Sequence, residues 1–459
     1  MTNVTVIGSG PGGYVAAIKA AQLGANVTVI EKDSVGGTCL NRGCIPTKAI
    51  LASADTLLKA KEAAAMGIII TGEIKADVPK IIERKDKIVS NLIKGIEFLF
   101  KKNKIKLVNG MGSIKSPTEV SVKSASGEEK TVKADMIILA TGSEAARIPI
   151  FPFDGRNVIT STEALKMTEI PQNILIVGAG AIGVEFASYY NALGSTVTIV
   201  EMLPQPVPTE DPDIAAELIR EYKKRGIKIL TGVKIEKVEI ASERSINATL
   251  STGETLNSNL VLVSIGRALN SSGIGLETAG VKTERGKILI DKHMRTSIPN
   301  IFAIGDVAGG MLLAHKASFE GIAAAENCMG AESAINYDVI PRCMFSEPEI
   351  ASVGLTEPQC KDKGFEVNTG KFSFRALGKA QAMGKLGGLV KIIADKKTDK
   401  ILGVHIIGSH TADIVHEGAV AMQAGVTAKQ LAQTIHVHPT LSEAVMEAAH
   451  GVHGETIHG

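Results

Sequence analysis

The chain carries one pattern twice: a short apolar strand, a glycine-rich turn, a helix, a second strand and a closing acid. The copies span residues 4–31 and 173–201, and the acid stands at the same spacing from the first glycine in both. The first glycine of such a turn makes the tight bend, the second lets the backbone approach a pyrophosphate, and the third lets the helix pack on the strand. The repeat predicts two α/β dinucleotide-binding folds and two nucleotides, with these turn glycines: Gly8, Gly10, Gly13, Gly178, Gly180 and Gly183.

The acid that closes each copy is Glu31 in the first and Glu201 in the second. An acid here hydrogen-bonds the 2′-hydroxyl of the ribose, whereas enzymes that use NADP generally place arginines nearby to hold the 2′-phosphate. An uncharged stretch follows Glu201, and the next arginine is Arg220. We therefore expect the second copy to bind NAD rather than NADP.

Two cysteines five positions apart, Cys39 and Cys44, lie in a glycine-rich stretch. Five residues of ideal helix turn through about 500°, so the two side chains would point apart unless Cys39 lies on the turn that leads into the helix. Gly36, Gly37 and Gly43 supply the freedom for such a turn. A disulfide across so short a loop is a weak structural staple but is consistent with a reversible two-electron switch. Two unrelated core thiols or half of a metal site are the alternatives, although no second cysteine or histidine cluster supplies the roughly four ligands of zinc.

The stretch that begins at His438 holds a second group of candidates. Thr440 and Glu443 have the spacing of a capping box, which predicts that they begin the final helix. A thiol substrate must lose a proton before it attacks a disulfide, so His438 and Glu443 are also candidates for a base and its orienting carboxylate. The tail histidines have no companion acid at ligand spacing and are expected to face solvent: His450, His453 and His458.

Composition excludes several classes of protein. The net charge of +2, with acids and bases interspersed, argues against a nucleic-acid-binding surface. No apolar run reaches the roughly 18 residues of a membrane span, and no basic, removable segment precedes the first strand. The five cysteines are odd in number and mostly isolated, unlike a secreted disulfide framework, so we expect a mature protein of the cytoplasm.

The string Gly-Gly-Thr-Cys-Leu-Asn-Arg-Gly-Cys-Ile-Pro at residues 36–46 resembles the redox motif of the flavin-dependent pyridine nucleotide-disulfide oxidoreductases, in the form found in dihydrolipoyl dehydrogenases. The segments 140–142, 295–306 and 438–443 resemble further motifs of that family. The resemblance implies an enzyme that holds FAD, acts as a homodimer, and uses NAD⁺ to oxidise dihydrolipoyl groups on a separate lipoyl-bearing protein, either an acyltransferase or a glycine-cleavage carrier. The alternatives are another NAD(P)H-dependent disulfide reductase of this fold and a structural flavoprotein subunit.

The same resemblance implies a role for each site residue. Cys39 would exchange with the substrate, Cys44 would face the flavin, and His438, oriented by Glu443, would serve the disulfide of the partner chain. Lys48 would lie near the flavin with Glu185 as its ion-pair partner. The residues implied in FAD binding are Gly8, Gly10, Gly13, Glu31, Lys48, Gly112, Thr141, Gly142, Asp306, Leu312, Leu313, Ala314 and His315, and those implied in NAD binding are Gly178, Gly180, Gly183, Glu185, Glu201 and Gly266.

The order of the motifs predicts four domains: an FAD-binding domain (1–147), an NAD-binding domain (148–270), a central domain that completes the FAD site (271–341) and a dimer-interface domain (342–459). The expected fold class is therefore α/β, with two Rossmann-like dinucleotide-binding domains and a C-terminal α+β dimerisation domain. Local patterns also predict helices over residues 47–66 and 77–102 and a β-meander over residues 105–132.

Overall fold

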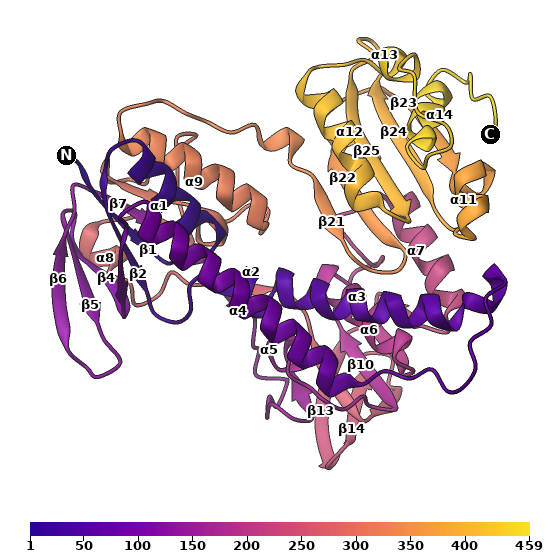
Figure 1. Cartoon of the computed structure of the whole chain (residues 1–459), viewed down its shortest axis with the longest axis horizontal. Helices are drawn as coiled ribbons and strands as arrows, with labels where there is room; N and C mark the ends of the chain where they lie inside the picture. The colour runs from indigo at the N-terminus through magenta and orange to yellow at the C-terminus, as the bar shows by residue number, and fades with distance from the viewer. The chain divides into compact units, whose positions relative to one another are not determined.

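The computed structural model describes all residues from Met1 to Gly459, and they form two compact units (Figure 1). Each unit contains one copy of the glycine-turn repeat. The four domain boundaries expected from the sequence stay a prediction. Unit 1 consists of Met1–Ile50, Pro79–Arg147 and Arg267–Ile335, and unit 2 consists of Leu51–Val78, Ile148–Gly266 and Asn336–Gly459.

Unit 1 is built on a parallel sheet of five strands in the order β20-β7-β1-β2-β3. Its central strands are rich in Val and Ile and almost fully buried, as expected for a parallel sheet with both faces covered. One edge strand, β20, comes from much later in the chain than its neighbours. The bounds are β1 (Asn3–Ile7), β2 (Asn26–Glu31), β3 (Lys106–Asn109), β7 (Met136–Leu139) and β20 (Ile301–Ala303).

The predicted meander is only partly correct. Its later strands form the antiparallel sheet of β4 (Met111–Ser116), β5 (Glu119–Lys123) and β6 (Glu129–Lys133). Its first predicted strand instead forms β3, in which Lys106 pairs with Thr28 of β2 in parallel. Val108 of β3 is 4% exposed and belongs to the core of unit 1, so burial in the parallel sheet outweighs the local alternation.

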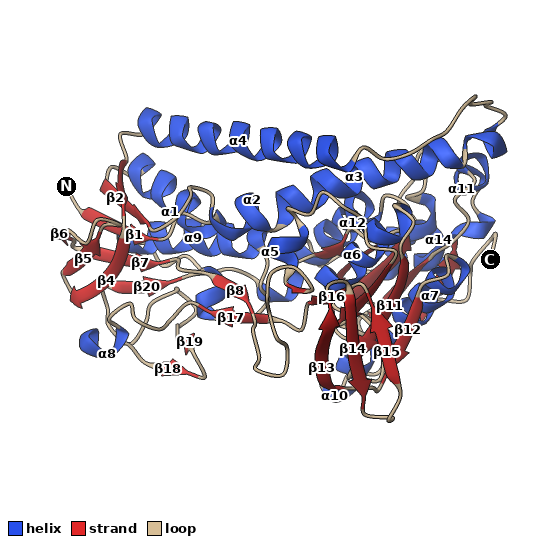
Figure 2. Cartoon of the chain, turned by 90° about the horizontal axis from the view of Figure 1, so that it is seen from below, coloured by secondary structure: helices blue, strands red, loops and turns tan.

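Helices α1 (Pro11–Gln22) and α9 (Ala314–Cys328) lie side by side in both cartoon views (Figure 1 and Figure 2). Their backbones approach through glycine, because a Cβ atom on Gly321 would lie 2.5 Å from the carbonyl oxygen of Gly12. Since α9 follows β20, the late segment adds both a strand and a helix to the first nucleotide fold. The smaller elements of unit 1 are α2 (Gly37–Arg42), α8 (Leu276–Ala279), β8 (Ser143–Ala145), β17 (Arg267–Leu269), β18 (Thr283–Glu284), β19 (Lys287–Ile288) and the 3₁₀ turn Gly305–Ala308.

Both long helices predicted before residue 105 are present. α4 (Val78–Lys102) begins one residue later than predicted. α3 (Cys44–Lys61) begins earlier than predicted, at the second cysteine, and a separate 3₁₀ turn (Ala63–Met66) follows it.

Unit 2 holds a second parallel sheet, in the order β12-β11-β10-β16-β9. β10 and β11 pair in the same register as β1 and β2, from the first residue of each strand onward. A three-stranded antiparallel sheet, labelled β13 and β14 in Figure 1 and β13 to β15 in Figure 2, follows β12. The bounds are β9 (Val158–Ile159), α5 (Ser161–Ala164), β10 (Asn173–Val177), α6 (Ala181–Ala192), β11 (Thr196–Glu201), α7 (Pro212–Lys224), β12 (Lys228–Thr231), β13 (Ile235–Ser242), β14 (Ser245–Leu250), β15 (Thr255–Ser258) and β16 (Leu260–Val263).

The C-terminal part of unit 2 is an antiparallel sheet in the order β21-β22-β25-β24-β23 (Figure 1). α12 (Thr411–Gln423) packs against β22 and β25, and α14 (Glu443–Gly451) packs against β23 and β24. Sheet and helices share one apolar core, in which Val404, Ile406 and Ala448 are fully buried. The remaining bounds are β21 (Arg342–Met344), β22 (Glu349–Gly354), α10 (Glu357–Asp362), β23 (Val367–Ser373), α11 (Gly378–Met383), β24 (Leu389–Asp395), β25 (Ile401–Gly408), α13 (Ala428–Ala432) and the 3₁₀ turns Tyr337–Val339 and Phe374–Ala376.

Two parallel-sheet nucleotide folds and a C-terminal α+β part confirm the expected fold class. No helix of the structure has both the length and the apolar character that crossing a membrane requires.

Candidate active site

The first glycine turn, between β1 and α1, tolerates only glycine at two of its positions. Gly8 has a φ of +99°, and a Cβ atom there would lie 2.3 Å from the carbonyl oxygen of Ala140. A Cβ atom on Gly13 would lie 2.0 Å from the carbonyl oxygen of Gly8. At Gly10 a Cβ atom would meet nothing within 4 Å, so this backbone is open to a ligand. The geometry fits the three glycine roles of a dinucleotide-binding turn.

Glu31 fixes the shape of this turn. Its Oε2 accepts hydrogen bonds from the N–H and the hydroxyl of Ser9, at 2.8 and 2.7 Å, and its Oε1 accepts one from the N–H of Asp33 at 2.9 Å. The carboxylate is 6% exposed. A carboxylate has about four lone-pair sites, so Glu31 keeps capacity for a ribose hydroxyl.

The N-terminus of α1 also fits a dinucleotide. Its N-cap is Gly10, and no side chain caps the first turn of the helix. The first N–H groups of a helix and the positive end of its dipole favour an anion, so this terminus is suited to a pyrophosphate. The residues around the first turn therefore fit the dinucleotide part of FAD.

The cysteine segment packs directly on the first turn. The N–H of Gly36 donates to the carbonyl oxygen of Ser9 at 3.0 Å. A Cβ atom on Gly37 would lie 2.7 Å from the Cα of Gly10, which explains why a glycine stands there. Helix α2, which carries Cys39, begins at Gly37, so the redox candidate lies beside the dinucleotide turn.

Cys39 and Cys44 lie on two consecutive helices. Cys39 is in α2. The helical conformation is interrupted at Gly43, which has a φ of −140° and a ψ of −116°, and Cys44 begins α3. The sequence-based expectation of a turn before the helix is therefore corrected: the first cysteine has a short helix of its own, and Gly43 supplies the bend. The side chains of the two cysteines are hydrogen-bonded to each other.

The electrostatics of this pair follow from its geometry. The hydrogen bond to Cys44, with burial as the next cause, raises the pKa of the Cys39 thiol, while the positive charge of Lys48 acts in the opposite direction. Cys39 and Cys44 therefore do not ionise together, and disulfide exchange uses one thiolate at a time as the sulfur that attacks or leaves.

Asp306 belongs to a polar network that the sequence analysis does not predict. The hydroxyl of Ser143 donates to Asp306 Oδ2, and Arg267 donates to the hydroxyl and the carbonyl of Ser143 at 2.6 and 2.7 Å. Thr38, the neighbour of Cys39, donates to the same carbonyl at 3.3 Å. Burial lowers the pKa of Arg267, and the negative charges of Asp306 and Cys44 oppose this shift. Ser143 directly follows the 140–142 motif and Arg267 directly follows Gly266, and these adjacencies are the only signals in the sequence.

The other residues implied in FAD binding lie in unit 1. Thr141 donates through its hydroxyl to the carbonyl of Asn270 at 2.7 Å, and Gly142 accepts from the N–H of Asn270 at 3.0 Å. Gly112 packs on the sheet, because a Cβ atom there would lie 3.0 Å from Ile7. The remaining members lie at the start of α9, where Leu313 is the N-cap: Leu312, Leu313, Ala314 and His315.

The second glycine turn repeats the first at the level of single atoms. A Cβ atom on Gly178 would lie 2.6 Å from the carbonyl oxygen of Ser264, and one on Gly183 would lie 2.0 Å from the carbonyl oxygen of Gly178. At Gly180 nothing lies within 4 Å. Glu201 accepts from the N–H groups of Ala179 and Leu203, at 2.8 and 2.9 Å.

Two further predicted residues lie in unit 2. Glu185 on α6 is 5% exposed and accepts a hydrogen bond from the N–H of Phe345 at 2.9 Å. Gly266 has a φ of +131°, and a Cβ atom there would meet nothing within 4 Å. The ion pair between Glu185 and Lys48 stays a prediction.

His438 and Glu443 lie in contact. His438 Nδ1 is 2.9 Å from Glu443 Oε1, and the side chains are 77% and 17% exposed. Burial acts against the shift, but hydrogen bonds from the Thr440 N–H and from His438 lower the pKa of Glu443. The carboxylate therefore stays charged and accepts the proton on Nδ1, which leaves Nε2 as the basic nitrogen.

The predicted capping box at this point is wrong. α14 begins at Glu443 itself, with Ser442 as its N-cap. Glu443 does accept the N–H of Thr440 at 2.8 Å, but the Thr440 hydroxyl donates to the carbonyl of Val437 at 2.7 Å and caps no helix. One carboxylate therefore both contacts His438 and keeps half of the capping box.

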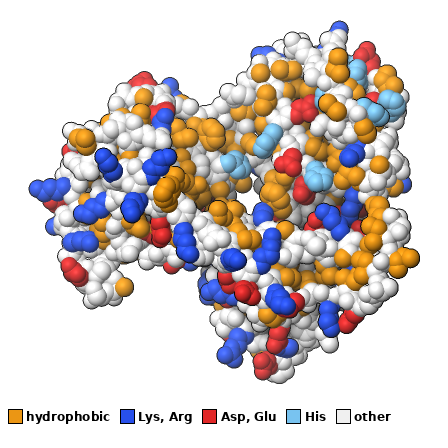
Figure 3. All heavy atoms as spheres, viewed as in Figure 1, with side chains coloured by type: hydrophobic (Ala, Val, Ile, Leu, Met, Phe, Trp, Pro, Cys, Tyr) orange, Lys and Arg blue, Asp and Glu red, His pale blue; other side chains and the backbone are white.

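Histidine side chains lie at the surface of the part that holds α14 and the C-terminus (Figure 3). Of the tail histidines, His453 and His458 are exposed as expected, and each lies beside an acid that is distant in the sequence. His458 Nδ1 lies 2.6 Å from Glu447 Oε1, and His453 Nε2 lies 3.2 Å from Asp399 Oδ1. The cysteine pair lies in unit 1, and His438 and Glu443 lie in unit 2.

Comparison with known proteins gives close relatives along the whole chain. Dihydrolipoyl dehydrogenase of Bacillus subtilis is 44% identical over 99% of this chain and 99% of its own length. The mitochondrial dihydrolipoyl dehydrogenase of Pisum sativum is 42% identical, covering 99% of this chain and 92% of the relative. Leghemoglobin reductase of Glycine max is 43% identical over 97% of this chain and 87% of the relative.

Solved structures share the fold. The crystal structure of LpdA from Mycobacterium tuberculosis is 28% identical and superimposes with a TM-score of 0.91, covering 98% of this chain and 99% of the other. The HOCl-induced flavoprotein disulfide reductase RclA of Escherichia coli is 26% identical, with a TM-score of 0.86 and coverage of 97% and 99%.

Family models match nearly the whole chain. Residues 2–321 match the model described as pyridine nucleotide-disulphide oxidoreductase, and residues 340–449 match its dimerisation domain. The matches confirm the expected flavin-dependent disulfide oxidoreductase, its FAD and NAD cofactors and its homodimer. Motif order, fold and relatives agree, and the chain belongs to the pyridine nucleotide-disulphide oxidoreductase family.

Proposed function

We propose that this chain is a dihydrolipoyl dehydrogenase that reoxidises protein-bound dihydrolipoyl groups with NAD⁺. The observation that carries the proposal is the hydrogen-bonded Cys39–Cys44 pair, in a segment packed on the first glycine turn. A disulfide switch beside a dinucleotide turn supports electron exchange between thiols and a flavin. Relatives named dihydrolipoyl dehydrogenase, such as those of Bacillus subtilis and Pisum sativum, support this substrate class.

In this proposal FAD lies at the first turn and NAD at the second. Gly10 and the N-terminus of α1 receive the FAD pyrophosphate, Glu31 binds its ribose, and Asp306 holds the chain that links to the flavin ring. Glu201 binds the ribose of NAD. When bound, FAD would supply the two-electron chemistry that links the cysteine pair to NAD⁺.

The residues of the chain carry the thiol chemistry. His438 takes the proton of one substrate thiol at Nε2, because Nδ1 already donates to Glu443. The thiolate attacks the sulfur of Cys39, the Cys39–Cys44 bond breaks, and the electron pair leaves on Cys44. The second substrate thiolate then displaces Cys39, which releases the lipoyl disulfide and leaves two enzyme thiols. The balanced result is that a dihydrolipoyl group and NAD⁺ give a lipoyl disulfide, NADH and one proton.

His438 serves the disulfide of the partner subunit in this proposal. Its side chain is 77% exposed, so it does not turn into the core of its own chain. The neighbouring Ile435 and Val437 are 97% and 75% exposed, and Val420 is 69% exposed. Exposed apolar side chains such as these support a face that a two-fold partner covers.

The electron donor is a separate lipoyl-bearing protein, an acyltransferase or a glycine-cleavage carrier. The cytoplasm stays the predicted location of the enzyme.

Replacement of Cys44 by serine tests the disulfide. We expect Cys44→Ser to lower NAD⁺-dependent oxidation of dihydrolipoamide more than about 10³-fold. FAD should stay bound, because the glycine turn, Glu31 and Asp306 hold it without the disulfide. Cys343→Ser is the matched control and should keep wild-type turnover. Wild-type activity in Cys44→Ser would refute the assignment.

A mixed dimer tests the shared site. Neither a Cys44→Ser nor a His438→Ala homodimer should turn over, because each lacks one half of both sites. A heterodimer of the two, isolated through different tags, regains one complete site and should recover up to about half of wild-type activity. If histidine and cysteines came from the same chain, both sites of this heterodimer would carry a lesion. An inactive, FAD-loaded heterodimer would therefore refute the shared site.

The same assays separate the alternatives. Another disulfide reductase of this fold would reduce a different disulfide, such as glutathione disulfide, with higher kcat/KM than lipoamide. A structural flavoprotein subunit would bind FAD and show no turnover with either disulfide.

A further inference from the structure

The segment between α13 and α14, residues 433–442, carries His438 but contains no helix or strand. Six of the seven residues from Gln433 to Pro439 are exposed, and His436 is the exception. The side chain of His436 is 6% exposed, whereas that of His438 is 77% exposed. His436 is therefore the one residue of 433–439 that is not exposed, and its side chain attaches this part of the segment to the rest of unit 2.

His436 is bracketed by two acceptors. Its Nε2 lies 2.5 Å from Glu417 Oε1 on α12, and its Nδ1 lies 2.8 Å from the carbonyl oxygen of Thr434. A carboxylate and a carbonyl only accept hydrogen bonds, so both ring nitrogens must donate. This geometry requires the doubly protonated, positively charged imidazolium.

The same charge faces the catalytic pair. The charged groups that face His436 are Glu417 on α12 and Glu443 on α14. The hydrogen bond to Glu417 is the largest cause that raises the pKa of His436, and burial opposes it. The positive charge of His436 in turn contributes to the lowered pKa of Glu443, after the larger effects of burial and of its hydrogen bonds. The charges of Glu417, His436 and Glu443 therefore alternate in sign, and Glu443 in turn contacts His438.

We propose that His436 is a positioning residue: a charged anchor, held by Glu417, that keeps the His438–Glu443 pair in its working geometry. The role of His438 as the base rests on the proposed function, whereas the anchoring of the segment does not. His436 touches neither substrate nor cofactor in this proposal and acts only through the segment and through Glu443.

Amide hydrogen exchange of residues 433–442 tests the anchor without any assay of activity. His436→Ala removes both ring donors and should speed exchange in this segment at least tenfold, because local opening follows the loss of its buried contact. The matched control is His458→Ala, which removes another histidine–carboxylate pair of the same unit, with Glu447 at 2.6 Å, and should leave the segment at the wild-type rate. Unchanged exchange in His436→Ala would overturn the proposal, whatever reaction the enzyme catalyses.

Two reactions of the FAD-loaded homodimer then test positioning. His436→Ala should lower kcat for dihydrolipoamide oxidation about 10²-fold, the loss that follows from a misplaced catalytic group. Reduction of ferricyanide by NADH bypasses the thiol step and should stay within about twofold of wild type. Equal loss of both reactions, or loss of neither, overturns the positioning role. A wild type that oxidises no dihydrolipoamide refutes the proposed function instead, and the exchange experiment still decides the anchor.

The pH profile tests the charge. Because the pKa of His436 is raised, its ion pair with Glu417 is complete at low pH and is lost as pH rises through that pKa. Wild-type kcat for the lipoyl reaction should therefore fall on the alkaline side. His436→Gln keeps an amide donor toward Glu417 but carries no charge, so it should recover part of the activity lost in His436→Ala and lack this alkaline fall. An alkaline fall equal to that of wild type in His436→Gln would overturn the charged anchor.

Discussion

The two nucleotide folds share their glycine turns almost atom for atom, but they differ in what is built onto them. The first fold gains β20 and α9 from residues 301–328, and α9 lies against α1 at Gly12 and Gly321. The second fold has Ile182 at the position that corresponds to Gly12. Only the first helix therefore has the glycine pair that lets another backbone approach closely. The difference fits a flavin that stays bound and a nicotinamide that comes and goes.

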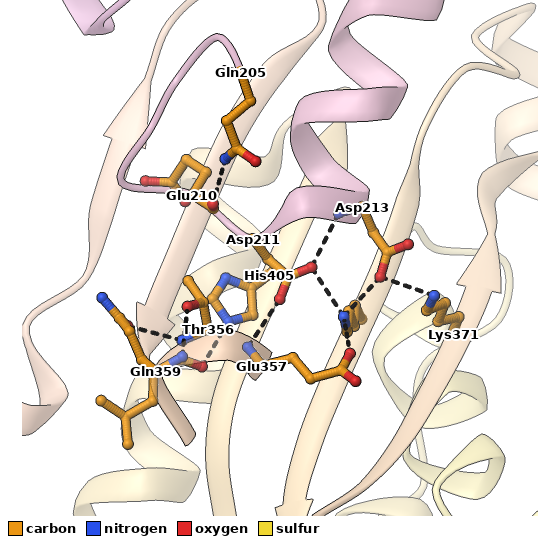
Figure 4. Close-up of polar contacts among 11 residues, drawn as sticks. Gln205, Glu210, Asp211, Asp213, Thr356, Glu357, Gln359, Lys371 and His405 are labelled. Carbon is orange, nitrogen blue, oxygen red and sulfur yellow. Dashed lines mark hydrogen bonds and ion pairs between the residues drawn. The ribbon is translucent and has the colours of Figure 1, made fainter. Parts of the chain in front are cut away.

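The second fold is instead tied to the C-terminal sheet of its own unit by charge. Asp211 caps α7 and is fully buried, and Asp213 follows it on the helix (Figure 4). The amino group of Lys391 on β24 lies 2.9 Å from Asp211, 2.6 Å from Asp213 and 2.6 Å from Glu357. Close packing of two helix backbones therefore completes the first nucleotide fold, whereas a cluster of ion pairs attaches the second fold to the C-terminal sheet.

Replacement of Lys391 by methionine should give the largest effect in this comparison. Lys391 is 1% exposed, so its loss leaves the buried Asp211 uncompensated and should cost about 3–5 kcal/mol of stability. Lys371→Met is the matched control: Lys371 also binds Asp213, at 2.8 Å, but its side chain is 48% exposed, so its loss should cost less than about 1 kcal/mol. Urea unfolding of the FAD-loaded protein measures both. Equal losses would remove the distinction between the buried and the surface bridge.

The cluster also makes a pH prediction. Burial opposes the shift, but the three carboxylates raise the pKa of Lys391. The stability that Lys391 contributes is then complete below its pKa in the unfolded chain, about 10.4. It is lost as pH rises through the raised pKa of Lys391 in the folded protein. The stability gap between wild type and Lys391→Met should therefore shrink only above about pH 10 on the alkaline side.

Gly321→Ala should break the packing of the first fold. The new Cβ atom would lie 2.5 Å from the carbonyl oxygen of Gly12, so α1 and α9 must separate, at a cost of about 1–3 kcal/mol and with loss of FAD. Gly95→Ala is the control, since Gly95 lies in α4 with nothing within 4 Å of a Cβ atom, and it should gain about 0.5–1 kcal/mol from helix propensity. Flavin absorbance after gel filtration and urea midpoints measure both. A Gly321→Ala protein that retains FAD and gains stability would contradict the packing role.

Coenzyme preference is the next test of the difference between the turns. Wild type should prefer NADH to NADPH by at least about 10²-fold in kcat/KM, because the charge of Glu201 repels a 2′-phosphate. Glu201→Gln keeps the shape of the side chain without its charge. It should therefore lower the ratio of kcat/KM for NADH to kcat/KM for NADPH about tenfold. Glu31→Gln should leave the ratio of the two coenzymes at the wild-type value. A wild type that uses both coenzymes equally would refute the role of Glu201.

Ser9→Ala should give the smallest effect, because it makes the first turn resemble the second. Glu31 accepts the hydroxyl of Ser9, whereas the corresponding residue of the second turn is Ala179, which offers only its N–H. Loss of one buried hydrogen bond to a charged group should cost about 1.5 kcal/mol, seen as a lower urea midpoint. No change would mean that the hydroxyl adds nothing to the first turn.

The sequence predicts what local spacing determines. Each glycine turn and its acid lie within one strand-helix-strand segment, so the roles of Gly8 and Glu31 follow from position alone. The contact of His438 with Glu443 is also local, although the capping box failed because the Thr440 hydroxyl donates to the carbonyl of Val437 instead.

The network around Ser143 is different in kind. Its contacts with Arg267 and Asp306 cross 124 and 163 residues of chain, and no local pattern specifies such partners. The placement of β3 failed for the same reason, because its partner strand β2 is far away in sequence. Long-range pairing decides these cases, and burial in the finished fold selects it.

The late origin of β20 has a consequence for biosynthesis. The N-terminal strands leave the ribosome first, but the sheet of unit 1 lacks one edge until residues 301–303 have been made. About 160 residues separate the end of β7 from the start of β20, and at about 5–20 residues per second they take about 8–32 s to make. During that time the edge of β7 is an unpaired strand rich in apolar side chains, which makes the nascent chain a client for chaperones and a source of aggregation. The segment that later closes the flavin fold therefore also ends the most vulnerable period of its synthesis.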